Sequence, residues 1–432
     1  MKSKQKLITE DHKQIDSPLT ESQESTKLIH KITFMFLGAS SLIGWNAVLT
    51  ALDFFSNRYP KSKGYGDVSF LFPIPLFIAN FFFGLLVPKL ADIYSLTIRI
   101  SGCLIGVAIF MIFLPILALL LPNNIGYYLC FLCTFFLGMF NSIAQNSSIA
   151  LASSTNQQLL GVFWTFTGVS GFSMNVSRAF VFLIFGANSY NSSTYGTIIY
   201  FILAVVITII TIFLQINFIK SEYYQEIQIR DQNNLLNKNT DGSAVSDNNI
   251  SIQNEEKPGI LGYIAILMQG FQKAGLAPVF IWFIYIQTFM LFPGVSVFQK
   301  KFHQLPDGWQ ALILITIYNF GDVTGKYVGS FKIFGLIFMY LTVMGRFVFY
   351  LTFLLTVHQL GNAFLQHDAF ACVNMYLFSF SNGFATSGLM RLAPEKAKVS
   401  KDRDLIAFIC AFGLTFGIMT GQLLALTLDQ QN

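Results

Sequence analysis

Apolar runs of about 20 residues recur along the whole chain, and they constrain its fold more than any other feature. One such run, coiled as a helix, is long enough to cross the roughly 30 Å of hydrocarbon in a bilayer. The residues are 53% hydrophobic and only 11% charged, and the mean hydropathy is +0.56, far from a soluble average. The weak alternating pattern of a membrane β-barrel is absent. The sequence therefore predicts an all-α polytopic membrane protein.

Charged residues, glycine, proline and asparagine bound these runs and place eleven expected membrane-spanning helices. The expected spans are 31–53, 68–88, 96–121, 125–150, 158–184, 195–219, 274–298, 309–331, 334–357, 366–392 and 404–428. A polar segment after the sixth span divides the chain into four expected regions: a cytoplasmic tail (1–30), a six-helix half (31–219), a cytoplasmic linker (220–273) and a five-helix half (274–432).

Lysine and arginine indicate the orientation in the membrane. Most of the 27 basic residues fall in the tail, the linker and the other segments on the same side as these two. Because cytoplasmic segments carry the excess of basic residues, we expect a cytoplasmic N-terminus and, with an odd number of spans, an outward C-terminus. Topology accounts for much of the net charge of +5, so no nucleic-acid partner is expected.

Two charges stand within the expected eighth span, at Asp322 and Lys326, with Asn319 one turn earlier. A charge at mid-bilayer costs about 2.5 to 3.5 kcal/mol even on lenient scales, so an ionisable residue there indicates a functional site. Four-residue spacing puts Asp322 and Lys326 on one helical face, where they can neutralise each other and still present donors and acceptors. A helix-packing ion pair with no ligand is the alternative.

Other polar or aromatic residues lie at similar depth in other spans. An isolated amide usually joins helices, whereas several on separate spans beside an aromatic ring suggest a binding site between two halves. Arg178 and Arg346 are the remaining intramembrane charges, and either a functional or a packing role is open for them. The full set of polar and aromatic residues at this depth outside the eighth span is Trp45, Asn46, Gln145, Arg178, Arg346 and Asn382.

Several motifs, in order along the chain, resemble the equilibrative nucleoside transporter family. These are G-W-N-A-V-L-T in the first span, S-I-A-Q-N-S-S in the fourth, G-V-S-G-F-S-M-N-V-S-R in the fifth, F-P in the seventh, D-V-T-G-K in the eighth, M-G-R-F in the ninth and F-S-N-G-F in the tenth. The resemblance implies a 6+5 arrangement like that of major facilitators. One departure stands out, since Lys326 occupies the position of the family's arginine.

The resemblance implies facilitative transport of nucleosides or nucleobases by alternating access, and this is the function we expect. The resemblance implies that Gln145 faces the purine, and from the polar and aromatic residues together we expect substrate contacts at Trp45, Gln145, Asn319, Asp322 and Lys326. Asn46, Arg178, Arg346 and Asn382 are expected to support the site or the helix packing. A carrier for another neutral polar solute, such as a sugar, is the alternative, and a titrating Asp322 leaves proton linkage open.

No ATP-binding motif or paired catalytic motif is present, so we expect neither a primary pump nor an enzyme, and no metal or other cofactor. Carboxylates are too sparse for the charged rings of a channel. We expect a monomer whose partners are membrane lipid and a nucleoside or nucleobase. The expected location is the plasma membrane rather than an endosomal or vacuolar membrane.

Overall fold

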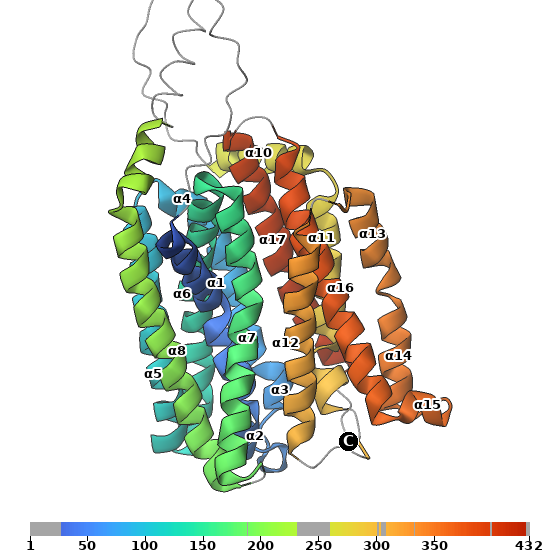
Figure 1. Cartoon of the computed structure of the whole chain (residues 1–432). Coiled ribbons are helices and arrows are strands. Elements are labelled where there is room, and N and C mark those ends of the chain that lie inside the picture. The colour runs from blue at the N-terminus through green and yellow to red at the C-terminus, as the bar shows by residue number, and fades with distance from the viewer. Residues whose placement is uncertain are drawn as a thin grey trace, which may run out of the picture.

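The computed structural model of the chain describes residues 27–187, 189–230, 260–299, 302–303, 308–331, 333–397 and 400–428. All regular structure within these ranges is helical, and the long helices run side by side in one bundle (Figure 1). The all-α fold expected from the apolar runs is therefore confirmed.

The helices follow the predicted spans closely. In the first half they are α1 (Leu28–Thr50), α2 (Leu52–Arg58), η1 (Lys61–Lys63), α3 (Val68–Leu71), α4 (Pro73–Ala91), η2 (Ile98–Gly102), α5 (Cys103–Leu120), α6 (Asn123–Thr155), α7 (Gln157–Phe185) and α8 (Tyr190–Ile219). In the second half they are α10 (Ile260–Ala274), α11 (Ala277–Leu291), η3 (Gly294–Phe298), α12 (Trp309–Gly329), α13 (Leu336–Gly345), α14 (Val348–Val357), α15 (Ala363–Gln366), α16 (Asp368–Glu395), α17 (Ser400–Ala425) and η4 (Leu426–Leu428).

Nine stretches in the described parts of the chain are long and apolar enough to cross a membrane. Two further long helices stand in the same bundle, α12 with 21 residues and α16 with 28. Both carry polar residues that lower their hydropathy, among them Asp322 and Asn382. The bundle is thus compatible with the predicted eleven spans.

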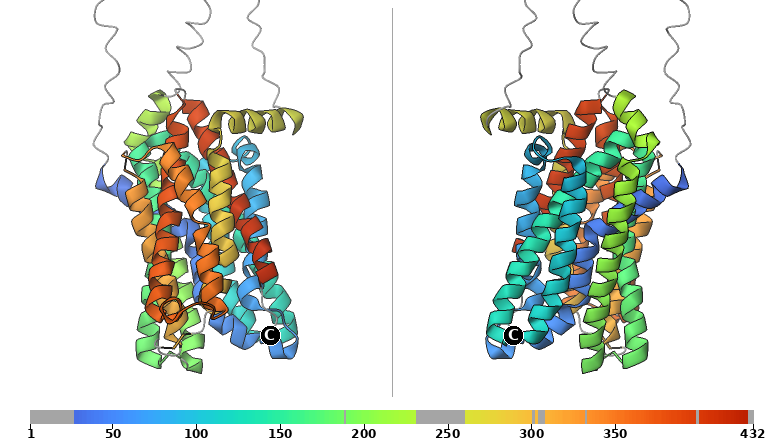
Figure 2. Two further views of the ribbon diagram at one scale, coloured as in Figure 1. Left: turned by 90° about the vertical axis from the view of Figure 1, so that its right-hand side faces the viewer. Right: turned by 90° about the vertical axis from the view of Figure 1, so that its left-hand side faces the viewer.

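Helix α10 lies across one end of the bundle, roughly perpendicular to the long helices (Figure 2). It is held there by α17, because the Lys273 ammonium lies 2.7 Å from the Asp402 carboxylate and Gly270 faces Leu405 and Ile409. Helix α10 falls within the segment expected to be a linker, at its end. The end of the bundle that carries α10 is the cytoplasmic end in the predicted topology, and α2 lies at the other (Figure 1).

Glycine allows the closest helix contact in the second half, between α12 and α16. A Cβ atom added at Gly325 would lie 2.8 Å from the Phe384 backbone nitrogen, and one at Gly321 would lie 2.9 Å from the Tyr376 carbonyl oxygen. Gly329 likewise meets α16 backbone. Since lipid supplies no hydrophobic drive between helices, such close approach is a main source of helix association.

Span nine is interrupted at mid-height. Helix α13 ends at Gly345, α14 begins at Val348, and Arg346 lies in the turn between them. Span one has a similar break at Ala51, between α1 and α2. Interrupted helices are common around polar sites in carriers, because the freed backbone groups must line a cavity or find partners within the protein.

Candidate functional site

The two charges of α12 form a buried ion pair. Lys326 Nζ lies 2.7 Å from Asp322 Oδ2, and the two residues are only 4% and 7% exposed. The other carboxylate oxygen, Asp322 Oδ1, accepts a hydrogen bond of 2.8 Å from Asn382 on α16. The pair is therefore neutral as a whole and stays anchored to a second helix.

A chain of polar groups extends from this carboxylate to Arg346. Asn382 Oδ1 lies 2.8 Å from the Thr288 hydroxyl, which accepts a hydrogen bond of 2.6 Å from Arg346 Nη2. The same guanidinium donates to Gln287 at 3.2 Å and to the Phe378 carbonyl oxygen at 2.6 Å. Arg346 is 1% exposed, so nearly every contact of this cation is with protein. The guanidinium joins the break in span nine to α11 and α16.

We expect Arg346→Lys to destabilise the protein. A single ammonium cannot reproduce the planar fork that Arg346 presents to α11 and α16, and a hydrogen bond from a charged group contributes about 1.5 to 3 kcal/mol. Thermal unfolding of the purified protein should show a lower midpoint. Arg403→Lys is the control, because Arg403 donates one exposed bond to the Ala397 carbonyl oxygen. Equal unfolding midpoints for the two variants would contradict a stabilising role for the contacts of Arg346 with α11 and α16.

Helix α7 of the first half packs against the polar face of α12. Lys326 Nζ donates to the Thr167 hydroxyl at 3.0 Å. A Cβ atom at Gly168 would lie 3.3 Å from Asp322 Oδ2, and one at Gly171 would clash with the Asn319 amide. The Asn319 amide nitrogen is buried and has no hydrogen-bond partner among the described residues. The charged pair therefore stands at the boundary between the two halves of the chain.

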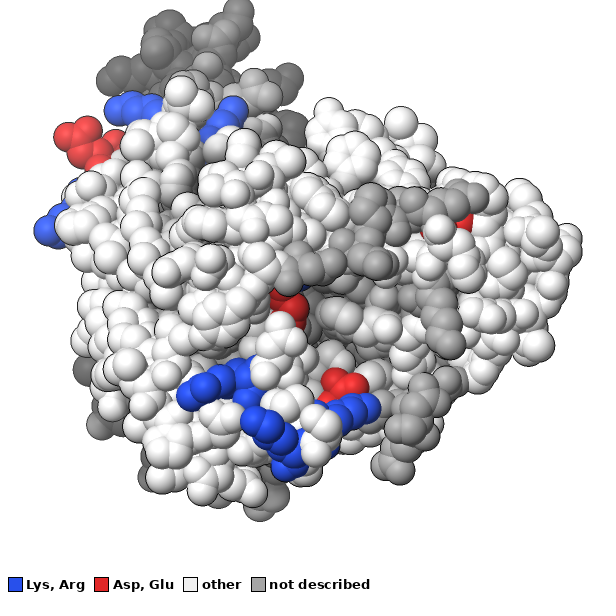
Figure 3. All heavy atoms as spheres, turned by 90° about the horizontal axis from the view of Figure 1, so that it is seen from below, with Lys and Arg blue, Asp and Glu red and all other residues white. Residues whose placement is uncertain are grey.

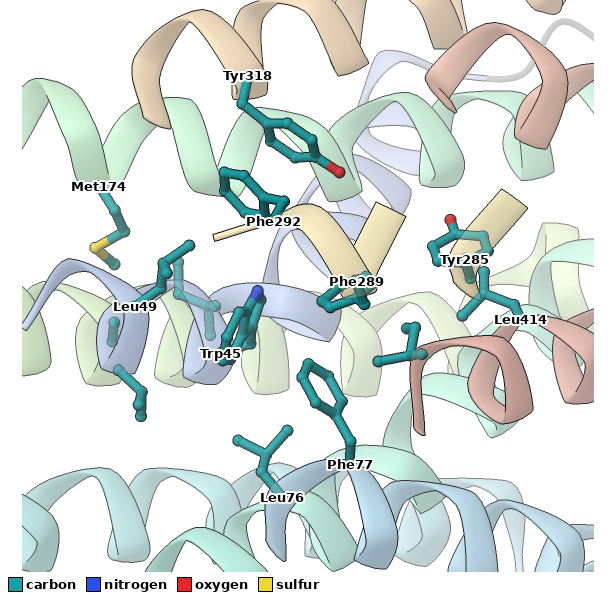
Figure 4. Close-up of a cluster of buried hydrophobic side chains, with 14 of the residues drawn as sticks. Trp45, Leu49, Leu76, Phe77, Met174, Tyr285, Phe289, Phe292, Tyr318 and Leu414 are labelled. Atoms are coloured by element: carbon teal, nitrogen blue, oxygen red, sulfur yellow. The ribbon is translucent and has the colours of Figure 1, made fainter. Parts of the chain in front are cut away.

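Aromatic rings from both halves lie beside this boundary (Figure 4). The Trp45 ring centroid on α1 is 4.9 Å from that of Phe77 and 6.3 Å from that of Phe289 on α11. One turn before Phe289, the Tyr285 ring is stacked on that of Phe289, with the centroids 6.2 Å apart. The rings thus form an aromatic wall to which both halves contribute.

Three predicted site residues are not joined to the charged pair by contacts. Gln145, on α6, is buried at 6% exposure. Asn46 donates to the Ser170 hydroxyl at 2.7 Å and so links α1 to α7. Arg178 lies towards the end of the bundle opposite α10, where its guanidinium pairs with Asp53 of α2 at 3.0 Å (Figure 1).

Several residues around the pair were not predicted from the sequence. Thr167, Thr288 and Gln287 complete the polar network, while Phe289 and Phe77 complete the aromatic wall. Hydroxyl residues are frequent in membrane helices and usually bond their own helix, so no signal singled out Thr167 or Thr288. The chain has 47 phenylalanines, which likewise hides Phe289.

A buried, neutralised polar pair facing an aromatic wall can bind a small ligand that has both hydrogen-bonding groups and a flat apolar face. The pair lies where α12 meets α7 and α16 within the bundle. Fold and site together define a polytopic membrane protein with a buried polar site among its helices.

The chain belongs to the nucleoside transporter family. The family profile, described as nucleoside transporter, matches residues 132–430. Relatives named as equilibrative transporters match over nearly the whole chain. Equilibrative nucleotide transporter 7 of Arabidopsis thaliana is 23% identical, over 91% of this chain and 94% of its own length. Human equilibrative nucleoside transporter 1 is also 23% identical, over 93% of this chain and 96% of its own length. The protein is thus a multi-pass membrane transporter of the equilibrative type, and its function is facilitative nucleoside transport.

Solved structures show the same fold at low sequence identity. A mutant of the nucleoside transporter NupG superposes with a TM-score of 0.53 at 13% identity, covering 91% of this chain and 90% of that chain. The major-facilitator proton:xylose symporter XylE superposes with a TM-score of 0.58 at 11% identity, covering 93% and 89%. The likeness confirms the predicted major-facilitator-like fold.

Proposed function

We propose that the nucleoside binds between the aromatic wall and the Asp322–Lys326 pair. The carboxylate accepts hydrogen bonds from sugar hydroxyls, and Lys326 and the unpartnered amide nitrogen of Asn319 supply donors. Trp45 covers one face of the base, and the buried amide of Gln145 bonds the base edge. The observation that carries this proposal is a neutral ion pair placed at the boundary between the two halves.

Other predicted residues hold this arrangement in place. Asn382 donates a hydrogen bond to the Asp322 carboxylate, and Arg346 is linked to Asn382 through the Thr288 hydroxyl. Asn46 links α1 to α7. Transport then follows from rocking of the half 31–219 against the half 274–432 around the site. The segment 220–273 connects the halves at the cytoplasmic end.

Uptake in a transporter-deficient host tests the assignment. Tritiated adenosine uptake should saturate, should accelerate with unlabelled nucleoside on the far side, and should be competed by nucleosides but not by glucose. Competition by glucose would favour the sugar alternative. We propose that the substrate crosses chemically unchanged, so chromatography should recover intact adenosine in a host that lacks enzymes acting on it.

We expect Lys326→Arg to retain uptake, because the guanidinium keeps the charge beside Asp322 and restores the fork found in the family motif. Lys326→Ala should abolish uptake, since it leaves the Asp322 carboxylate buried without its cation. Initial rates of adenosine uptake, normalised to surface expression, measure both effects. Equal rates for the two variants would contradict a substrate-facing cation at this position.

We propose a cycle that needs no ion gradient. Asp322 pairs with Lys326 and accepts a hydrogen bond from Asn382, so the pair is neutral without a bound ion. Collapsing the proton gradient at constant external pH should therefore leave the initial rate of adenosine uptake unchanged. A large fall in that rate would instead support proton linkage through Asp322.

We also propose a plasma-membrane location and a monomeric carrier. Imaging of a tagged protein in cells tests the location, and an endosomal or vacuolar pattern would contradict it. Mass measurement by light scattering in detergent tests the oligomeric state, with a monomer of 48.5 kDa expected for the protein component.

A further inference from the structure

Two cavities at the outer end of the bundle share Asp53 and Phe298. Their volumes are about 720 Å³ and about 400 Å³. The larger one lies between the halves, because α2, α7 and α8 line one side while Phe298 of η3 and Ala311 of α12 line the other. Figure 3 shows this face, with basic side chains gathered beside a hollow that contains an acidic one. Neither cavity is lined by the Asp322–Lys326 pair.

Positive charge dominates the lining of the larger cavity. Arg58, Lys63 and Arg178 line it, against Asp53 alone. Arg58 is fixed in place, because its Nε and Nη2 atoms donate to the carbonyl oxygens of Ala118 at 2.8 Å and of Leu121 at 3.1 Å. The cavity is therefore electropositive, with an excess of two cations over its single carboxylate.

The charged residues that line the smaller cavity have a net negative charge. Asp53 and Asp67 line it together with Lys61, which lies 2.9 Å from the Asp67 carboxylate. Burial alone would raise the pKa of Asp67, but hydrogen bonds from Ser69 and Lys61 outweigh it and lower the pKa below its usual value of 3.8. Asp67 is thus charged at neutral pH. An anion entering the outer mouth is attracted to the larger cavity and not to the smaller one.

Arg178 has hydrogen-bonding capacity that the protein does not use. The residue is 5% exposed, its Nη2 atom pairs with Asp53, and its guanidinium lies 5.0 Å from the centre of the Phe182 ring. Its Nε atom is buried and has no hydrogen-bond partner in the described residues. A buried donor without an acceptor is costly, so the site favours a ligand that brings one.

Helix N-termini meet at the same cavity. Asn123 is the first residue of α6, Ser189 and Tyr190 begin α8, and Gly308 precedes the first turn of α12. Each N-terminus exposes backbone N–H groups and the positive end of the helix dipole, a combination that binds anions. The three helix dipoles therefore increase the positive potential that the three basic side chains create in this cavity.

We propose that the larger cavity binds a phosphate monoester, specifically a nucleoside monophosphate. The basic side chains and helix N-termini receive the phosphate, and Phe182 and Phe298 supply apolar area for the base. The volume lies within the range of small-molecule sites. Because the ligand touches both halves, it hinders their relative movement and inhibits nucleoside uptake from outside. The inhibition rests on the proposed carrier cycle, whereas the binding does not.

Calorimetric titration of the purified full chain with adenosine monophosphate tests the binding. Lys63→Gln should weaken the affinity about tenfold, the effect of one lost charge-assisted contact. Lys61→Gln removes the same charge two residues earlier, from the smaller cavity, and should leave the affinity unchanged. Absence of binding by the wild type, or equal effects of the two variants, would overturn the proposal.

Further titrations test which ligand binds and at which site it binds. Inorganic phosphate and glycerol phosphate should bind more weakly than adenosine monophosphate; if either bound as tightly, the nucleotide assignment would be overturned. Asp322→Ala should lose adenosine binding and keep adenosine monophosphate binding. Loss of both would place the nucleotide in the central site and overturn a separate outer site. Retention of both would leave the outer site standing and reject the central one, so the two failures are distinguishable.

Discussion

Asp322→Ala is expected to lower adenosine uptake about 100-fold or more at equal surface expression. Removing one partner of a buried ion pair costs about 3 to 5 kcal/mol, because the other charge stays buried without compensation. Here the orphaned charge is Lys326, which is 4% exposed and keeps its hydrogen bond to the Thr167 hydroxyl. In the proposed binding mode the substrate also loses a charged hydrogen-bond acceptor. Initial uptake rates in a transporter-deficient host measure the effect.

A double variant separates ligand binding from helix packing. Asp322→Asn combined with Lys326→Gln removes both charges of the pair and leaves neither one unpaired, so it should recover most of the thermal stability lost in Asp322→Ala. If the pair only packs helices, uptake should recover together with stability. If it holds the substrate, uptake should stay low while the unfolding midpoint returns, and this is the outcome we expect.

Gly325→Ala is expected to destabilise the protein more than any other single methyl addition in α12. The new Cβ atom would overlap the Phe380 carbonyl oxygen and lie 2.8 Å from the Phe384 backbone nitrogen. Backbone cannot rotate away as a side chain can, so α12 must move from α16, at a cost of about 1 to 3 kcal/mol or more. Thermal unfolding and the yield of folded protein measure the loss.

Gly161→Ala provides the matched control. Gly161 lies within α7, and a Cβ atom there would meet nothing within 4 Å. Alanine in an open helical position should stabilise by up to about 1 kcal/mol relative to glycine. A midpoint for Gly325→Ala equal to or above that for Gly161→Ala would contradict the tight contact between α12 and α16.

Hydropathy and spacing predicted much of the fold. Long apolar runs define the spans because the bilayer requires continuous helices, and the four-residue spacing of Asp322 and Lys326 placed them in contact. Helix α10 was not predicted, because the search was for helices long enough to cross a bilayer. Its 15 residues are too few for that, and the preceding sequence is polar. Contacts made by short hydroxyl side chains, such as Thr167 and Thr288, depend on how helices pack and leave no pattern in one sequence.

Ion pairs between residues far apart in the chain could not be predicted from the sequence either. Arg178 was expected to be an intramembrane charge, whereas its partner Asp53 lies after the break in span one and borders the outer cavities. Nothing in the spacing of residues so far apart joins them. Gln145 is the reverse case, since the family resemblance assigned it a role and it lies buried on α6, a helix that carries neither member of the charged pair.

Transport of adenosine into proteoliposomes containing only the purified protein tests the central claim most directly. With no ion gradient, labelled adenosine should enter faster than into protein-free vesicles, stop when the inner and outer concentrations are equal, and enter at the background rate with Asp322→Ala. Entry at the background rate by the wild type, or accumulation above the outer concentration that appears only with an imposed ion gradient, would contradict an equilibrative nucleoside carrier built around the Asp322–Lys326 pair.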